Sequence, residues 1–163
     1  MNERFVELYK ELIDRRIPTS NVLDKLKSLG DFSDDLLERM EEQLAVRNYV
    51  ALSRMIHAVY LVPDRKFTPI LCQLLDDHPY EGYMEAVADA LIDIQDERSI
   101  PSILRSLDNY LETDADYHFN RKLVVALLKI GTKEAIDGIK LASKSPKELI
   151  RERAERALEE LNV

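Results

Sequence analysis

The sequence has little of several residue types that mark particular protein classes. Its 163 residues include one cysteine, four glycines, six prolines and no tryptophan. A single cysteine excludes an internal disulfide framework, and so few glycines argue against glycine-rich phosphate-binding loops and collagen-like repeats. The cysteine, Cys72, stands within the apolar run 70–75, so we expect it to be a small core hydrophobe and not a reactive thiol.

Long apolar runs are also missing. No uncharged stretch approaches the ~20 residues that a membrane-spanning helix needs, and the start of the chain leads into no apolar signal-peptide core. A composition of 45% hydrophobic and 33% charged residues favours a folded chain over a disordered one. We therefore expect one cytoplasmic domain, 1–163, that folds without disulfides.

The negative charge is concentrated in the middle of the chain. The net charge of the whole chain is -8, whereas segment 76–116 contains twelve acidic residues and two arginines, a net charge of -10. The rest of the chain is therefore slightly positive. An acidic centre repels nucleic-acid phosphates and anionic lipids, so we expect a partner of neither kind.

A repeated apolar pattern predicts pairs of helices. Alanines recur at intervals of 31 to 36 residues, with apolar residues three places before and one and four places after each of them. Offsets of three and four define one face of a helix. These anchors are Ala58, Ala90, Ala126 and Ala157. Second apolar stretches over 67–75, 100–107 and 135–141 lie between them, so each repeat contains two helices.

Prolines and capping residues place the helix ends. Pro79 and Pro146 precede second helices of their pairs, where a proline is tolerated because the first N–H groups of a helix have no intrahelical partner. Thr19 and Ser20 are expected to cap a helix that ends at Gly30. The sequence thus predicts an all-α solenoid of about ten helices. Residues 1–30 form an N-terminal helical cap, and 31–163 form about four helix pairs.

The repeat resembles the short-period HEAT-like repeats of phycobilin-lyase-like proteins. The matching form is Asp-x-x-x-x-Pro-x-x-Leu followed by a helix ending Ala-Leu-x-x-Ile, and it is clearest over 64–161. The resemblance implies an α-α superhelix whose second helices line a concave face, and such faces usually bind other proteins. It implies little about chemistry.

One predicted helix carries a row of four acidic residues. Glu81, Glu85, Asp89 and Asp93 follow one another at four-residue intervals, a spacing at which like charges repel. Arg121 and Lys129 on the following second helix are candidates for neutralising part of the row. Two interpretations stay open: a solvated face with ion pairs between helices, and a docking strip for a basic protein.

The connection inside the third pair is the second candidate for partner binding. It is longer than its counterparts and mixes carboxylates with tyrosines, which offer both charge and contact area. The candidates here are Tyr110, Glu112, Asp114, Asp116 and Tyr117. Tyr110 and Tyr117 either cap the core or contact a partner, and Phe119 is expected in the core.

The sequence contains little that resembles a catalytic or metal-binding motif. His57, His78 and His118 are scattered, no glutamate follows any of them, and no zinc-ligand spacing is present. The resemblance therefore does not extend to HEAT-like deoxyhypusine hydroxylases, which hold iron with His-Glu pairs. We expect no catalytic residues, no metal and no cofactor, although Asp114 and Asp116 beside His118 leave a divalent cation as a minor alternative.

The function predicted from the sequence is non-catalytic protein binding. Size and acidity resemble those of bacterial immunity proteins that neutralise a basic toxin domain, an analogy without a motif. The alternative is a lyase-like enzyme or chaperone that binds a small ligand in the concave groove. The sequence leaves the oligomeric state open.

Overall fold

The computed structural model describes residues 2–77, 84–109 and 117–162, and of Tyr117 only the backbone. Within these ranges the regular structure is entirely helical, with ten α-helices, short 3-10 helices and no strand, which confirms the all-α prediction. The α-helices are α1 (Glu3–Ile13), α2 (Thr19–Leu26), α3 (Ser33–Ala45), α4 (Tyr49–Val59), α5 (Thr68–Asp77), α6 (Met84–Ile94), α7 (Ile100–Asn109), α8 (Tyr117–Ile130), α9 (Lys133–Ala142) and α10 (Glu148–Glu160).

The chain divides into two compact units, here unit 1 (Met1–Ile70) and unit 2 (Leu71–Val163). The boundary falls inside α5, and not at residue 30, where the sequence suggested that a helical cap gives way to repeats. The expectations of one domain and of a cap over 1–30 stay predictions. The two units are described separately below.

Unit 1 packs its helices around α4. Helix α1 lies against α2 and α4, and α3 lies against α4. Aromatic rings fill one end of this core, where the rings of Phe5 and Phe32 stack with centroids 5.5 Å apart. Asn2 caps α1 by accepting hydrogen bonds from the N–H groups of Arg4 and Phe5, so the first turn has a partner for two of its free donors.

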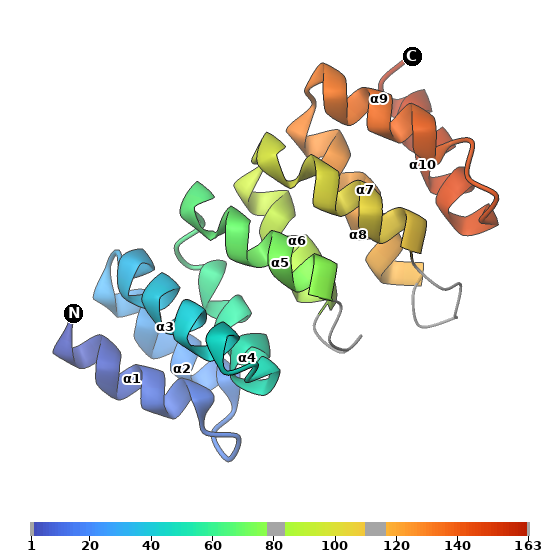
Figure 1. The fold of residues 1–163 in the computed structure, drawn as a ribbon. Helices are drawn as coiled ribbons and strands as arrows, with labels where there is room; N and C mark the ends of the chain where they lie inside the picture. Colours follow the sequence, from blue (N-terminus) through green and yellow to red (C-terminus); the bar gives the residue numbers. More distant parts are fainter. Residues whose placement is uncertain (1, 78–83, 110–116, 163) are drawn as a thin grey trace. The chain divides into compact units, whose positions relative to one another are not determined.

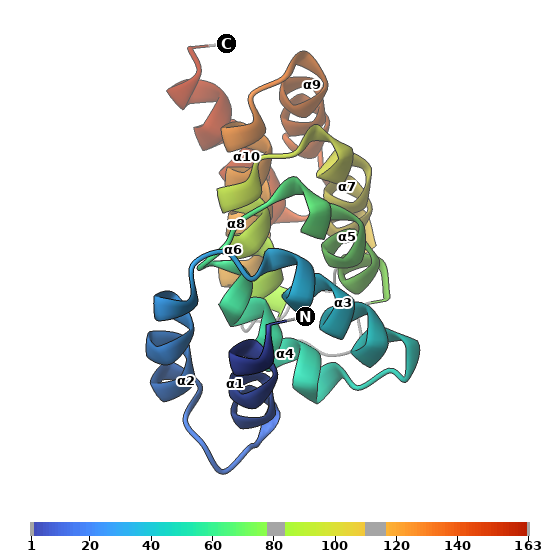
Figure 2. The same cartoon turned by 90° about the vertical axis from the view of Figure 1, so that its left-hand side faces the viewer.

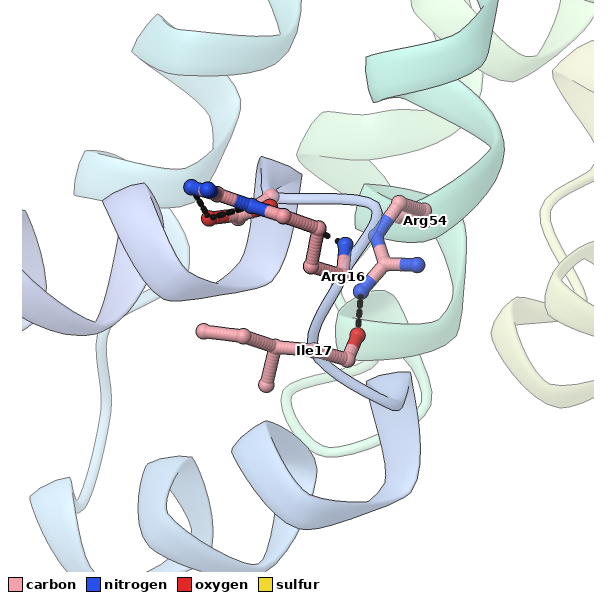
Figure 3. A network of polar contacts seen from close by, with 4 residues as sticks. Arg16, Ile17 and Arg54 are labelled. Atoms are coloured by element: carbon pink, nitrogen blue, oxygen red, sulfur yellow. Dashed lines mark hydrogen bonds and ion pairs between the residues drawn. The ribbon is translucent and has the colours of Figure 1, made fainter.

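Arg54 of α4 ties down the connection between α1 and α2. Its Nε donates to the carbonyl of Leu12. Its Nη2 donates to the carbonyl of Ile17, a contact drawn in Figure 3. These carbonyls lie at and beyond the end of α1, where helical backbone acceptors lack intrahelical donors. In the same turn, the exposed Arg16 pairs with Asp14 at 2.6 Å, and this hydrogen bond lowers the pKa of Asp14 to about 2.

The start of α2 differs from the prediction. Thr19 and Ser20 were expected to cap a helix over 21–29, but α2 begins at Thr19, with Pro18 at the capping position and no side-chain cap. The fixed φ of proline already suits a helix start, and the Pro18 carbonyl accepts from the N–H of Asn21 at 3.1 Å. The chain turns after a short 3-10 helix (Lys27–Leu29), where Gly30 has a φ of 76°.

Unit 2 has two layers of helices. Helices α5, α7 and α9 form one layer, and α6, α8 and α10 form the other (Figures 1 and 2). Helix α8 is central, because it packs against α6, α10, α9 and α7. Ala90, Ala126 and Ala157 are all buried in this unit, as Ala58 is in unit 1, so all four anchor alanines lie in the interior, as the predicted register requires.

The links between successive pairs repeat the same local geometry. Asp64, Asp96 and Thr132 each accept a hydrogen bond from a backbone N–H two or three residues later and so cap the following helix. Two of these caps follow a residue in the left-handed region, Gln95 with a φ of 52° and Gly131 with a φ of 66°. Such a residue ends a helix by turning the chain away from it.

Candidate functional site

Three of the predicted partner-binding residues lie together on α6. Glu85, Asp89 and Asp93 occupy successive turns of this helix. Glu81, Tyr110, Glu112, Asp114 and Asp116 lie outside the described residues, and Tyr117 begins α8 with only its backbone described. Phe119 is buried, as predicted. The candidate site that can be built from the structure is therefore the α6 row, defined as Glu85, Asp89 and Asp93.

The packing of α6 explains why this row faces outward. The helix buries Val87, Ala90, Leu91 and Ile94, which place one continuous apolar face against the rest of unit 2. The α6 row lies off this face, so Glu85 and Asp89 are half-buried and Asp93 is exposed. The core position of Ala90 thus fixes where the carboxylates emerge.

One lysine of the neighbouring helix pairs with two of these carboxylates. Lys122 Nζ of α8 lies 3.0 Å from Glu85 Oε2 and 2.7 Å from Asp89 Oδ2. The Lys122 side chain is 28% exposed, against 45% for Glu85 and 41% for Asp89, so water still reaches both acids. Two carboxylates on one ammonium leave a local excess of negative charge, to which Asp93 adds.

The environment of Lys122 favours its charged form. Burial is the largest single influence and lowers its pKa, but the hydrogen bonds that Lys122 donates to Asp89 and Glu85, together with the negative charges of these acids, raise the pKa overall. Lys122 is thus held as an ammonium between the two acids at neutral pH.

Lys122 was not among the basic residues that the sequence suggested for this role. Arg121 and Lys129 were candidates to neutralise the row, whereas the structure places Lys122 there. One residue along a helix is a rotation of about 100°, so Lys122 reaches the carboxylates of α6 while Arg121 borders hollows on both the α6 side and the α10 side of α8. Lys122 lies four places before the buried anchor Ala126, so its place on the helix could be read from the sequence.

A groove between α8 and α10 was not anticipated from the sequence. It has a volume of about 280 Å³ and is bordered by three arginines and one glutamate: Arg121, Arg153, Arg156 and Glu160. Val124, Val125 and Leu128 lie at its base. A second hollow of about 250 Å³ lies between α6 and α8 and shares Arg121 and Val125 with the first. The signal available in the sequence was the group of arginines in the last helix, Arg151, Arg153 and Arg156.

Cys72 is less buried than expected. We predicted a core residue, but the side chain is half-buried on α5. Burial raises the pKa of its thiol, and the nearby Asp76 carboxylate acts in the same direction. A thiol held in its protonated form is a poor nucleophile. Cys72 therefore lacks the environment of a reactive cysteine.

Asp76 belongs to a structural ion pair. Arg105 of α7 donates to it at 2.8 and 3.0 Å, and Ser102 donates at 3.0 Å. The hydrogen bond from Arg105 is the main reason that the pKa of Asp76 is lowered. These contacts join α5 to α7 and account for the polar groups around Cys72.

In the part of the chain that the structure describes, no three histidine, cysteine, aspartate or glutamate side chains gather closely enough to hold a metal ion. The cation alternative rested on Asp114 and Asp116, which lie outside these residues. Across 2–77, 84–109 and 117–162, no helix combines the length and the apolar character needed to cross a membrane.

Comparison of the chain with protein-family models, with curated proteins and with solved structures finds no match.

Proposed function

We propose that this protein is a non-catalytic, HEAT-like protein-binding module that docks a partner with a basic surface through the α6 row. The observation that carries the proposal is the charge balance of the row. Three carboxylates project from α6, and Lys122 offsets two of them only in part. Asp93, the exposed end of the row, is where a basic group of a partner would first make contact.

The ion pairs with Lys122 give Glu85 and Asp89 a part in folding, but the row as a whole still carries an electrostatic cost. Like charges at four-residue spacing cost a helix a few tenths of a kcal/mol per pair, roughly 0.2 to 0.5. An uncharged residue at either position would avoid that cost. A surface that binds a cationic partner gains from the same charges, because they speed the encounter and exclude acidic competitors.

The specific case that we propose is a cytoplasmic immunity protein that neutralises a basic toxin domain. Its support is the size of the chain, its net charge of -8 and the concentration of acidic residues around α6. The same charge disfavours nucleic acids and membranes as partners.

The lyase-like alternative has weaker support. Small-molecule pockets usually enclose at least about 300 Å³ and bury most of their ligand. Among the residues that the structure describes, the hollows on either side of α8 measure about 280 and 250 Å³ and are open to solvent. A large planar ligand such as a tetrapyrrole would stay mostly exposed in either.

Site-specific photo-crosslinking in the native source tests the proposal. The photoreactive residue p-benzoylphenylalanine replaces Asp93 in one variant and the exposed Asp137 of α9, in the other layer of unit 2, in a matched control. We expect the first variant to crosslink a protein with a basic surface and the control to crosslink it weakly or not at all. No crosslinked protein at position 93, or equal yields at both positions, would contradict the proposal.

A further inference from the structure

The groove between α8 and α10 has the opposite charge to the rest of unit 2. Three of its four charged border residues are arginines, in a chain whose net charge is -8. Arg121 and Arg156 are exposed and stand on different helices, so their guanidinium groups approach the groove from two sides. A concentration of positive charge of this kind attracts carboxylates.

The base of the groove is aliphatic. Val125 and Leu128 are only half-buried, so part of each side chain remains open to a ligand. Covering such apolar surface contributes roughly 25 cal/mol for each Å² removed from water. A ligand that fits the groove therefore combines negative groups for the arginines with an aliphatic group for the base.

We propose that this groove binds a peptide segment of a partner protein in which acidic side chains flank one or two leucine-like side chains. The planar guanidinium of arginine matches a carboxylate with two parallel hydrogen bonds, which Arg121 and Arg156 can offer from opposite sides. This site goes beyond the function proposed above, because it uses none of the α6 row and selects the opposite charge.

The charge of the chain also favours a short acidic peptide over a polyanion as the ligand of this groove. A nucleic acid or a phosphate-rich surface would bring many charges close to the acidic α6 row, whereas a short acidic segment brings two or three. Neither phosphates nor free inorganic anions use the aliphatic base. Glu160, the one acid at the border, weakens the attraction of the groove for any anion. Replacing Glu160 by a neutral residue should therefore strengthen binding, whereas replacing an arginine should weaken it.

A methyl-detected NMR titration of the full chain tests the site. The probe is an acetylated and amidated peptide, Glu-Glu-Leu-Leu-Glu-Glu, added at low salt. We expect shifts of the Val124, Val125 and Leu128 methyl signals that saturate with a dissociation constant of about 1 mM, as suits a few exposed charge pairs and one covered aliphatic side chain. The peptides Lys-Lys-Leu-Leu-Lys-Lys and Glu-Glu-Ser-Ser-Glu-Glu should each shift them much less.

Variants at the border give the decisive comparison. Arg121→Gln and Arg156→Gln should each weaken binding roughly two- to fivefold, and Glu160→Gln should strengthen it by a similar factor. Lys140→Gln, on an exposed lysine of α9, changes the charge of the chain equally and should have little effect. Two results would overturn the proposal: no saturable shift of these methyl signals in the parent, or equal affinity in the parent and the double variant Arg121→Gln/Arg156→Gln.

Discussion

Lys122 of α8 lies 2.7 Å from Asp89 of α6 and joins the acidic row to the helix beside it. The same ammonium reaches Glu85 one turn earlier, so one cation opposes the repulsion between two carboxylates. This contact makes the row compatible with a folded helix and still leaves each acid partly in water. Glu85 and Asp89 therefore have a structural role in addition to the partner-binding role that we propose for the α6 row.

Lys122→Gln should destabilise the protein by about 1 kcal/mol, because Glu85 and Asp89 then repel each other without a cation between them. Urea unfolding measures the loss, and Lys129→Gln, on an exposed lysine of the same helix, is the matched control. In a Glu85→Gln/Asp89→Asn background the loss should disappear. Equal stability of Lys122→Gln and the parent would mean that the contact does not stabilise the fold.

The anchor alanines should not tolerate larger side chains. Ala90→Leu and Ala126→Leu each add three carbon atoms at a buried position, and overpacking of this kind typically costs about 1 to 3 kcal/mol. Thermal unfolding should show a lower melting temperature for both variants. Ala45→Leu, at the exposed end of α3, is the control and should melt close to the parent. Parent-like melting of both core variants would show that the repeat register is wrong.

The helix ends at Gln95 and Gly131 share one backbone geometry, so substitutions at these two positions should change the stability in opposite directions. Gln95 and Gly131 both have positive φ, and the N–H of each bonds the carbonyl four residues earlier, at 3.0 and 3.1 Å. Gln95→Gly should stabilise by about 0.5 to 1 kcal/mol, and Gly131→Ala should destabilise by about 1 kcal/mol, because only glycine adopts this conformation without strain. Chemical denaturation measures both. A destabilised Gln95→Gly would contradict the shared geometry.

Arg54 should matter far more than its neighbour Arg16. Arg54→Met removes the donor from two backbone carbonyls and should cost about 1.5 to 3 kcal/mol in unit 1. Arg16→Met removes an arginine that is 89% exposed and pairs with Asp14 of its own turn, so it should cost much less than Arg54→Met. Hydrogen exchange of the α1 and α2 amides measures the difference. Equal protection in the two variants would contradict the role of Arg54.

The fold could be read from the sequence because the apolar spacing of each helix repeats. Alanine at one position of successive second helices indicated which face is buried, and the structure places all four anchors in the interior. Helix ends were less predictable: a proline at the capping position moved the start of α2 to Thr19. The spacing of apolar residues predicts which face of a helix is buried better than it predicts the residue at which the helix begins.

The site was only partly predictable. The α6 row followed from spacing within one helix, but its partner Lys122 depends on how α6 and α8 are rotated about their own axes. Periodicity within a helix does not give that rotation. The groove bordered by Arg121 and Arg156 could not be predicted for the same reason. It combines residues of α8 and α10, and the sequence does not show which sides of these two helices face each other.

The central claim is that the α6 row receives a basic partner, and the association rate of the partner crosslinked at position 93 tests it most directly. Neutral replacements suit the test better than lysines, which would repel Lys122, so the variant is Glu85→Gln/Asp89→Asn/Asp93→Asn. Its control, Glu134→Gln/Asp137→Asn/Glu155→Gln, removes three exposed acids elsewhere in unit 2.

Association should be measured at about 50 and about 500 mM salt, which spans the range over which exposed charges become screened. For the parent and the control we predict fast association at low salt that slows at high salt. The α6 variant should associate about tenfold more slowly at low salt and lose most of the salt dependence. An unchanged association rate in the α6 variant, together with salt-independent binding by the parent, would contradict the account.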